Sequence, residues 1–196
     1  MYIQLIHRVI QFPDDSFFLF GPRGSGKSRA LKAAYPHAIY IDLLKSAQYL
    51  RYLNRPDIIL EELRALPAGT RVILDEVQRI PMLLNDVHSA IEELDLKFAL
   101  CGSSSRKLRH AGVNLLAGRA LSLRMFPFLP EELGSDFDLD EALRFGTLPL
   151  IWAAKNKKPK LKAYAQTYLR EEVQAEALVR NLGDFARFLP VAALMH

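Results

Sequence analysis

The sequence has a single cysteine and no long apolar run among its 196 residues. One cysteine, Cys101, cannot form an internal disulfide or a cluster of thiolate metal ligands, and it suits a reducing cytoplasm. The apolar stretches fall short of the roughly 18 residues that a membrane span needs. The N-terminal stretch places His7 and Arg8 among apolar residues and lacks the pattern of a signal peptide. These absences favour a cytoplasmic protein.

The sequence also lacks a large excess of positive or negative charge. Lys and Arg number 26 against 22 Asp and Glu, for a formal net charge of +4. This mild excess is compatible with binding a polyanion such as ATP, but it does not by itself indicate a nucleic-acid-binding protein. The basic residues are scattered and no zinc-ligand spacing exists, so a sequence-specific DNA binder has little support. The basic run Lys155–Lys160 is most simply a solvated loop, with nucleic-acid contact as the alternative.

What the sequence does contain is a phosphate-binding loop after a short apolar stretch, Phe17–Phe20. Eight residues satisfy the pattern G-x-x-x-x-G-K-[ST]: Gly21, Pro22, Arg23, Gly24, Ser25, Gly26, Lys27 and Ser28. The glycines allow backbone conformations that other residues resist, so that several N–H groups can point at a polyphosphate. The alternative is a glycine-rich turn without a ligand. The apolar strand before the loop and the helical residues 29–34 after it favour the nucleotide site.

Two residues of this loop have expected roles of their own. Lys27 places a cation on the terminal phosphates, and the hydroxyl of Ser28 is positioned to ligate Mg²⁺. The helix that follows directs the positive end of its dipole at the same phosphates. The loop therefore predicts binding of a nucleoside triphosphate with magnesium.

A second informative stretch is the apolar run Val72–Leu74, which ends in Asp75 and Glu76. A continuous apolar run is typical of a strand that is buried on both faces of a parallel sheet. Asp75 can hold Mg²⁺, directly or through water, beside Ser28. Glu76 can polarise the water that attacks the γ-phosphate. An acidic strand end without a ligand is the alternative, and the phosphate loop earlier in the chain makes the catalytic interpretation stronger.

Two further positions are candidates for sensing or stabilising the γ-phosphate. Ser103 follows the predicted strand Lys97–Cys101 and can reach the phosphate or the attacking water, although one of the serines here can also cap the next helix. Arg119 precedes the predicted strand Ala120–Phe126, where it can project into the site of a neighbouring subunit as an arginine finger. A solvated surface arginine is the alternative to this role, and Arg106 is a weaker finger candidate.

The order of these patterns predicts an α/β fold. Strands alternate with helices through residues 1–128, which is typical of a doubly wound parallel sheet with right-handed crossovers. In such sheets the ligand lies at the carboxyl ends of the strands. Helices are expected over residues 1–11, 45–66 with a break at Arg55–Pro56, 80–95 and 108–117. Residues 129–196 show no further clear strand and predict a small helical subdomain. That subdomain looks truncated, because its last apolar segment has no stop signal.

Several segments together resemble the predicted AAA+ ATPases of bacteria and archaea. The segments are 21–28 (GPRGSGKS), 73–81 (ILDEVQRIP), 101–108 (CGSSSRKL), 114–120 (NLLAGRA), 145–149 (FGTLP) and 168–173 (YLREEV). The resemblance covers nearly the whole chain. It implies a P-loop NTPase with a five-stranded parallel sheet in the order 5-1-4-3-2, followed by a helical lid.

The resemblance also implies a set of functional residues and partners. It makes Lys27, Ser28, Asp75 and Glu76 the nucleotide, metal and catalytic set, and it supports Ser103 or a neighbour as the sensor. It adds a Gly-x-x-Pro turn in which Pro149 lies against the nucleotide base. It favours ATP over GTP. Family members carry a further C-terminal domain that is absent from this sequence, and that domain is where a protein or DNA partner is expected.

Three functions remain open from the sequence. The first is a Mg-dependent ATPase that couples nucleotide state to movement of the lid or a partner. The arginine finger, if it acts between subunits, would make this ATPase a homo-oligomer. The second is a nucleotide-operated switch that hardly turns over. The third is a small-molecule kinase, which shares the phosphate loop and would need lid arginines, available at Arg170, Arg180 and Arg187. Glu76 favours the ATPase, because mere binding needs no catalytic carboxylate.

Overall fold

The computed structural model describes residues 6–103, 108, 116–168, 173 and 181–194. The chain divides into two compact units, residues 1–137 and 138–196. The first contains a sheet with helices, and the described part of the second contains helices only. Among the described residues, no helix is both long and apolar enough to cross a membrane.

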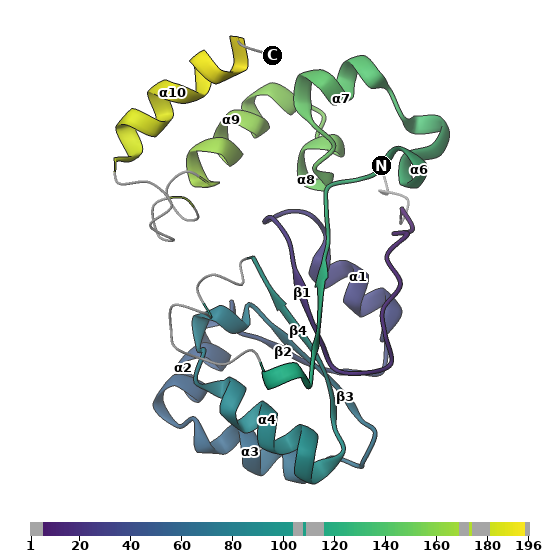
Figure 1. Ribbon diagram of the computed structural model, residues 1–196, viewed down its shortest axis with the longest axis vertical. Coiled ribbons are helices and arrows are strands. Elements are labelled where there is room, and N and C mark those ends of the chain that lie inside the picture. The colour runs from purple at the N-terminus through teal and green to yellow at the C-terminus, as the bar shows by residue number, and fades with distance from the viewer. Residues whose placement is uncertain (1–5, 104–107, 109–115, 169–172, 174–180, 195–196) are drawn as a thin grey trace. The chain divides into compact units, whose positions relative to one another are not determined.

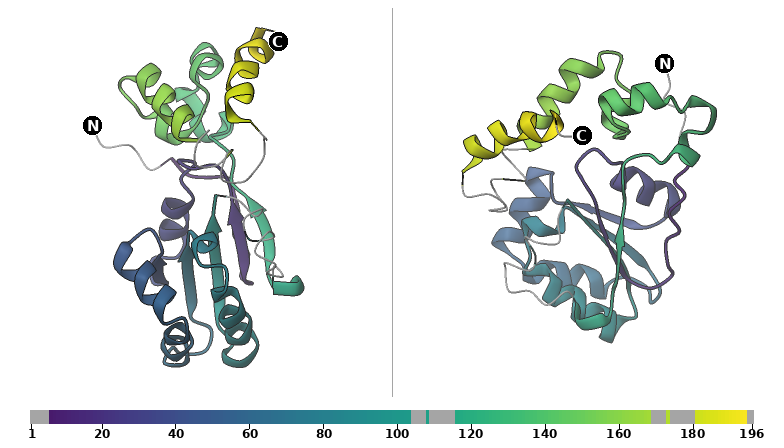
Figure 2. Two further views of the ribbon diagram at one scale, coloured as in Figure 1. Left: turned by 90° about the vertical axis from the view of Figure 1, so that its left-hand side faces the viewer. Right: turned by 45° about the horizontal axis from the view of Figure 1, so that its top comes forward.

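Five parallel strands form the sheet of the first unit (Figure 1). They are β1 (Phe17–Phe20), β2 (Ile39–Asp42), β3 (Arg71–Asp75), β4 (Lys97–Gly102) and β5 (Leu121–Arg124). Their order is β2-β3-β4-β1-β5, which confirms the expected order 5-1-4-3-2. Every residue of the inner strand β1 is buried, as expected for a strand covered on both faces. Figure 2 shows the same strands from two further directions.

Helices cover both faces of this sheet. They are α1 (Lys27–Ala34), α2 (Ser46–Asn54), α3 (Asp57–Arg64) and α4 (Leu83–Leu94). The first unit also contains the short α6 (Pro130–Leu133) and 3-10 turns at Val77–Arg79, Leu116–Gly118 and Gly134–Asp136. Successive residues of β1 point to opposite faces. Phe18 belongs to the core cluster that α2, α3 and α4 complete, whereas Phe17 and Leu19 pack with Leu31 of α1. The predicted break at Arg55–Pro56 is confirmed, because α2 and α3 are separate helices.

The second unit consists of α7 (Leu139–Phe145), α8 (Pro149–Trp152), α9 (Lys157–Tyr168) and α10 (Leu182–Leu194). Lys157 ties two of these helices together, since its ammonium pairs with Glu141 at 2.6 Å and lies 5.0 Å from the ring centroid of Trp152. Because α9 begins at Lys157, most of the predicted basic loop is helical. Pro159 is tolerated there because the first turn of a helix does not use its backbone N–H groups.

The boundary between the units lies after Phe137, whereas the sequence suggested a division after Phe128. Helix α6 belongs to the first unit because Glu132 is bonded to Arg8 and to the backbone N–H of Val9. The same contacts explain why the predicted N-terminal helix is wrong over residues 6–11, which are not helical. Residues 1–5 and most of the predicted helix 108–117 lie outside the described residues.

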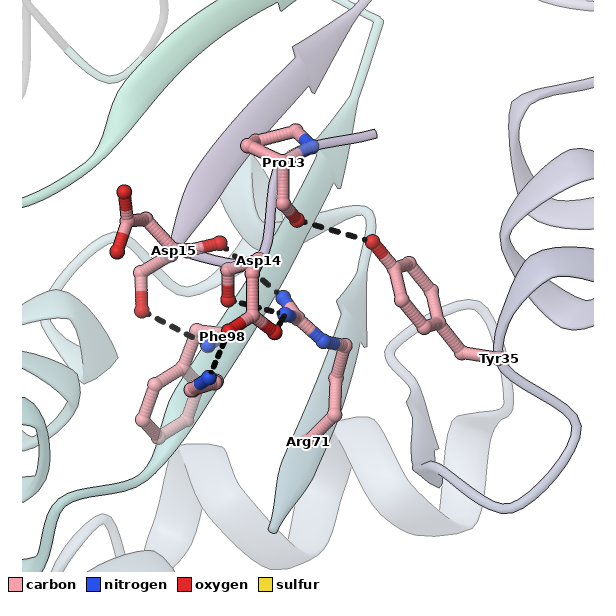
Figure 3. Close-up of polar contacts among 8 residues, drawn as sticks. Pro13, Asp14, Asp15, Tyr35, Arg71 and Phe98 are labelled. Atoms are coloured by element: carbon pink, nitrogen blue, oxygen red, sulfur yellow. Dashed lines mark hydrogen bonds and ion pairs between the residues drawn. The ribbon is translucent and has the colours of Figure 1, made fainter. Parts of the chain in front are cut away.

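A polar cluster holds the amino ends of the strands, at the edge opposite the predicted phosphate loop (Figure 3). Arg71, the first residue of β3, donates to the backbone carbonyl of Asp15 at 3.2 Å and to that of Asp14. Lys97, the first residue of β4, forms an ion pair with the Asp14 carboxylate. Tyr35 donates to the carbonyl of Pro13 at 3.1 Å. This cluster fixes the start of β1, the strand that leads into the phosphate loop.

Candidate functional site

The predicted site residues gather at the carboxyl edge of the sheet. Phe20 is paired in register with Gly102 on β4, and Asp75 is paired with Cys101 on the same strand. The loop after β1, the acidic pair at the end of β3 and Ser103 after β4 therefore share one edge of the sheet. Ligands bind at this edge in open parallel sheets.

The loop between β1 and α1 has the backbone that its glycines predict. Gly24 and Gly26 have φ values of 76° and 91°, in the left-handed region that disfavours a Cβ atom. Gly21 is needed for a different reason, because a Cβ atom there would lie 2.2 Å from the carbonyl oxygen of Met125. The end of β5 thus packs directly against the start of the loop.

Ser25 in the loop and Lys27 at the start of α1 are both buried. Lys27, the first residue of α1, points its ammonium back at the loop and donates to the carbonyl oxygens of Gly21 at 2.7 Å and Pro22 at 3.1 Å. Ser25 is fully buried, and its hydroxyl has no hydrogen-bond partner within the described part of the chain. A cation and the N-terminus of α1 therefore face the space that the loop encloses, which suits an anion.

Asp75 is 3% exposed at the end of β3. Its Oδ2 accepts a hydrogen bond from the phenol of Tyr40 on β2, whereas Oδ1 is buried with no partner among the described residues. Burial and the bond to Asp75 raise the pKa of Tyr40, and a contact with the Ser28 hydroxyl opposes that shift. Tyr40 therefore stays a neutral donor that contacts both of the predicted metal ligands.

Cys101 adds no charge to this site. It is completely buried in the core cluster on the α1 side of the sheet, as the sequence suggested for a small core residue. Burial raises the pKa of its thiol well above the ordinary value, and the neighbouring Asp75 carboxylate raises it further. The thiol is therefore neutral near pH 7.

Glu76 occupies a special backbone position. Its φ and ψ are 60° and 41°, a left-handed conformation that costs a residue with a Cβ atom about 1–2 kcal/mol. The side chain amide of Gln78 donates to the Glu76 carboxylate and to the hydroxyl of Ser103, the latter at 3.3 Å. Gly102 makes room for this arrangement, because a Cβ atom there would lie 2.3 Å from Oε1 of Gln78. The strained turn and Gln78 together join the predicted catalytic and sensor residues.

The residues present fit a magnesium ion that is coordinated partly by the protein and partly by the phosphates of a nucleotide. The described residues contain no group of three or more His, Cys, Asp and Glu side chains that could hold a metal by themselves. Mg²⁺ needs no such cage, because it is usually bound by one or two protein oxygens together with phosphates and waters. Oδ1 of Asp75 and the Ser28 hydroxyl supply oxygens of this kind.

Two predicted site residues lie elsewhere in the fold. Arg119 precedes β5, at the amino edge of the sheet, and its guanidinium forms an ion pair with Glu92 of α4. At that end of the strand it is remote from the phosphate loop of its own chain. Pro149 is the first residue of α8 in the second unit. The alternative finger residue Arg106 lies outside the described residues.

Three polar residues of this region were not singled out from the sequence: Arg8, Tyr40 and Gln78. Tyr40 lies two residues before the end of β2, and Gln78 lies two residues after Glu76. Their positions near the ends of strands were the sequence signal that could have marked Tyr40 and Gln78 as site residues. The sequence held no such signal for Arg8, because Arg8 lies in a segment that the apolar pattern predicted to be helical. Its contacts with residues 126–132 depend entirely on the tertiary fold.

The fold and the site define a P-loop nucleotide-binding protein of the α/β class. A family profile described as an AAA domain matches residues 14–134, more than half of the chain. The chain therefore belongs to the AAA domain family, whose members are P-loop ATPases. A search of curated proteins found no significant match.

Among solved structures, the chain is similar to the Walker-type ATPase PABY2304 of Pyrococcus abyssi, with 16% identity, a TM-score of 0.48 and coverage of 89% of this chain and 71% of that one. The replication initiator DnaA bound to AMPPCP and single-stranded DNA shares 16% identity, with a TM-score of 0.44 and coverage of 83% and 58%. A variant of RuvB from Thermotoga maritima shares 17% identity, with a TM-score of 0.42 and coverage of 82% and 56%.

Proposed function

We propose that this protein binds ATP with Mg²⁺ and hydrolyses it. The observation that carries the proposal is the buried oxygen Oδ1 of Asp75, which has no partner in the described part of the chain. Leaving a buried carboxylate oxygen unsatisfied is costly, so a ligand is expected there. The oxygen belongs to the same sheet edge as the phosphate loop, and the AAA domain match covers both.

The roles of the chain's own residues follow from their positions. The N–H groups of residues 21–28 and the Lys27 ammonium bind the phosphates once the nucleotide replaces the loop carbonyls as the partner of Lys27. Asp75 and Ser28 hold the magnesium ion, which would supply charge stabilisation to the phosphates. Glu76 orients and deprotonates the attacking water, and Ser103 senses the γ-phosphate through its contact with Gln78.

Two further assignments concern groups outside this edge of the sheet. Arg119 acts on the nucleotide of a neighbouring subunit, because it lies at the opposite end of β5 from its own phosphate loop. This role makes the active form a homo-oligomer. Pro149, the first residue of α8, is the candidate contact for the nucleotide base, and it follows the turn at Gly146.

Replacement of Glu76 by Gln tests the hydrolytic role. We expect Glu76→Gln to retain ATP binding and to lower steady-state phosphate release by about a hundredfold or more, as for removal of a general base. The matched control is Glu61→Gln on the exposed side of α3, which is expected to leave both unchanged. Equal rates for the wild type and Glu76→Gln would remove Glu76 from the mechanism.

A nucleotide-operated switch with little turnover is the second candidate. The hydrogen bond from Gln78 to the Glu76 carboxylate favours it, because this bond occupies an oxygen that the general base needs. The switch predicts tight ATP binding and a change of conformation with negligible phosphate release. Measurement of binding and turnover on the same sample separates the two functions.

A further inference from the structure

Arg8 connects the phosphate loop to a distant segment of the first unit. Its guanidinium donates to the carbonyl oxygen of Ser25 at 2.8 Å and to that of Phe126 at 2.6 Å. Its Nε forms an ion pair with Glu132 at 2.9 Å, and its cationic group lies 5.0 Å from the ring centroid of Phe128. The side chains of Arg8 and Glu132 are only 11% and 2% exposed. This is a buried charge pair with defined geometry.

The bond from Arg8 to Ser25 fixes the direction of one peptide group in the loop. A trans peptide is planar, so the carbonyl of Ser25 and the N–H of Gly26 point in opposite directions. With Arg8 holding that carbonyl on its own side, the Gly26 N–H points to the opposite side of the peptide. A phosphate cradle depends on N–H groups that point inward together. Gly26 has a φ of 91° and can adopt the reverse orientation as readily, so an external restraint matters at this position.

Glu132 carries the same connection into α6. One carboxylate oxygen accepts from Arg8 and from the N–H of Val9 at 2.9 Å. The other accepts from the N–H of Leu129 at 3.1 Å and caps the start of the helix. The guanidinium of Arg8 thus holds the loop peptide with one nitrogen and the helix start with another. Residues 126–132 lead along the chain to the second unit.

We propose that Arg8 is a positioning residue of the phosphate cradle, and that the Arg8–Glu132 pair transmits occupancy of the cradle to residues 126–132. This inference rests on the proposed function. Phosphates that bind the Gly26 N–H polarise the same peptide group and strengthen its carbonyl as an acceptor for Arg8. Arginine suits this position because its fork of donors serves several acceptors at once, whereas lysine presents a single point charge.

The first test compares Arg8→Lys with the wild type in calorimetric binding of pyrophosphate, a probe that contacts only the cradle. We expect the dissociation constant for pyrophosphate to rise about tenfold. The matched control is Arg71→Lys, which alters an arginine of similar burial that bonds backbone carbonyls at the opposite edge of the sheet. It is expected to lower thermal stability and to leave pyrophosphate affinity unchanged. Equal affinity of Arg8→Lys and the wild type would overturn the positioning role.

The second test uses the unaltered protein and therefore does not depend on the folding of a variant. Hydrogen exchange at the N–H groups of Val9 and Leu129 is expected to slow when pyrophosphate is added, because both bond Glu132. Unchanged exchange at saturating pyrophosphate would refute transmission through the pair. Failure of the wild type to bind pyrophosphate or ATP at all would instead refute the proposed function, so the two failures are distinguishable.

Discussion

The phenol of Tyr40 donates a hydrogen bond to Oδ2 of Asp75 and leaves Oδ1 of the same carboxylate buried, with no partner among the residues that the structure describes. The bond restrains the carboxylate's rotation, so that the protein satisfies one oxygen and, under the proposed function, the other is available to the metal ion. Groups that orient a metal ligand in this way affect metal affinity strongly.

Replacement of Tyr40 by Phe should therefore weaken the metal site more than the nucleotide site. We expect the magnesium concentration for half-maximal phosphate release to rise about 10- to 100-fold, with little change in metal-free ATP binding. Tyr52→Phe is the matched control, since Tyr52 also donates to a carboxylate, that of Glu62, within the helical layer. An unchanged magnesium requirement in Tyr40→Phe would contradict the orienting role.

Gln78 should control the rate of the chemical step. Gln78→Met keeps the length of the side chain and removes the amide that bonds Glu76 and Ser103. We expect kcat to fall about 10- to 150-fold, because a hydrogen bond to a charged group is worth about 1.5–3 kcal/mol, and KM to change little. Steady-state phosphate release across ATP concentrations measures both constants. An increase in kcat would show that the bond restrains Glu76, as the switch function requires.

Arg119 should affect ATP turnover only when subunits associate. Under the proposed finger role, ATP turnover per subunit rises with protein concentration in the wild type, and Arg119→Ala removes that rise and lowers the plateau about a thousandfold or more. Arg55→Ala serves as control, because Arg55 is likewise an exposed arginine paired with a carboxylate, that of Asp57. A concentration-dependent rate that survives in Arg119→Ala would exclude this arginine.

Asp14 should make stability depend on pH in the acidic range. The hydrogen bond and charge of Lys97, and then the charge of Arg71, hold its pKa below the ordinary value of 3.8. A lowered carboxyl pKa contributes stability above the ordinary value, and the contribution is lost as the pH falls through the folded-state pKa. The Tm of Asp14→Asn should thus lie slightly below that of the wild type at neutral pH, because the pair is exposed.

The two Tm values should converge as the pH falls through the folded-state pKa of Asp14, below the ordinary value of 3.8. Thermal unfolding followed by circular dichroism across pH measures this difference. Asp15→Asn is the control, because it keeps the backbone carbonyl that Arg71 contacts. A Tm difference between Asp14→Asn and the wild type that stays constant with pH would contradict the assignment.

Much of the fold could be predicted because the signals are local. The apolar run before Gly21 and the one before Asp75 each predict a buried strand, and both strands are found. The pairing of turn residues with such runs also placed the phosphate loop and the acidic pair at one edge of the sheet. The prediction of a helix over residues 1–11 is wrong over residues 6–11, because the side chain of Arg8 and the N–H of Val9 are bonded to Glu132, far along the chain.

The sequence by itself determined which residue types the candidate site contains. A glycine-rich loop with Lys27 and Ser28, followed by Asp75 and Glu76 after an apolar strand, predicts phosphates and magnesium as the ligands, because such residue types at such spacing serve them. Only the tertiary structure decided how these groups are held. Tyr40 reaches Asp75 from a neighbouring strand, Gln78 joins Glu76 to Ser103, and Arg8 holds the loop from outside. These contacts join elements distant in the chain, and their geometry arises only when the sheet brings the strand ends together.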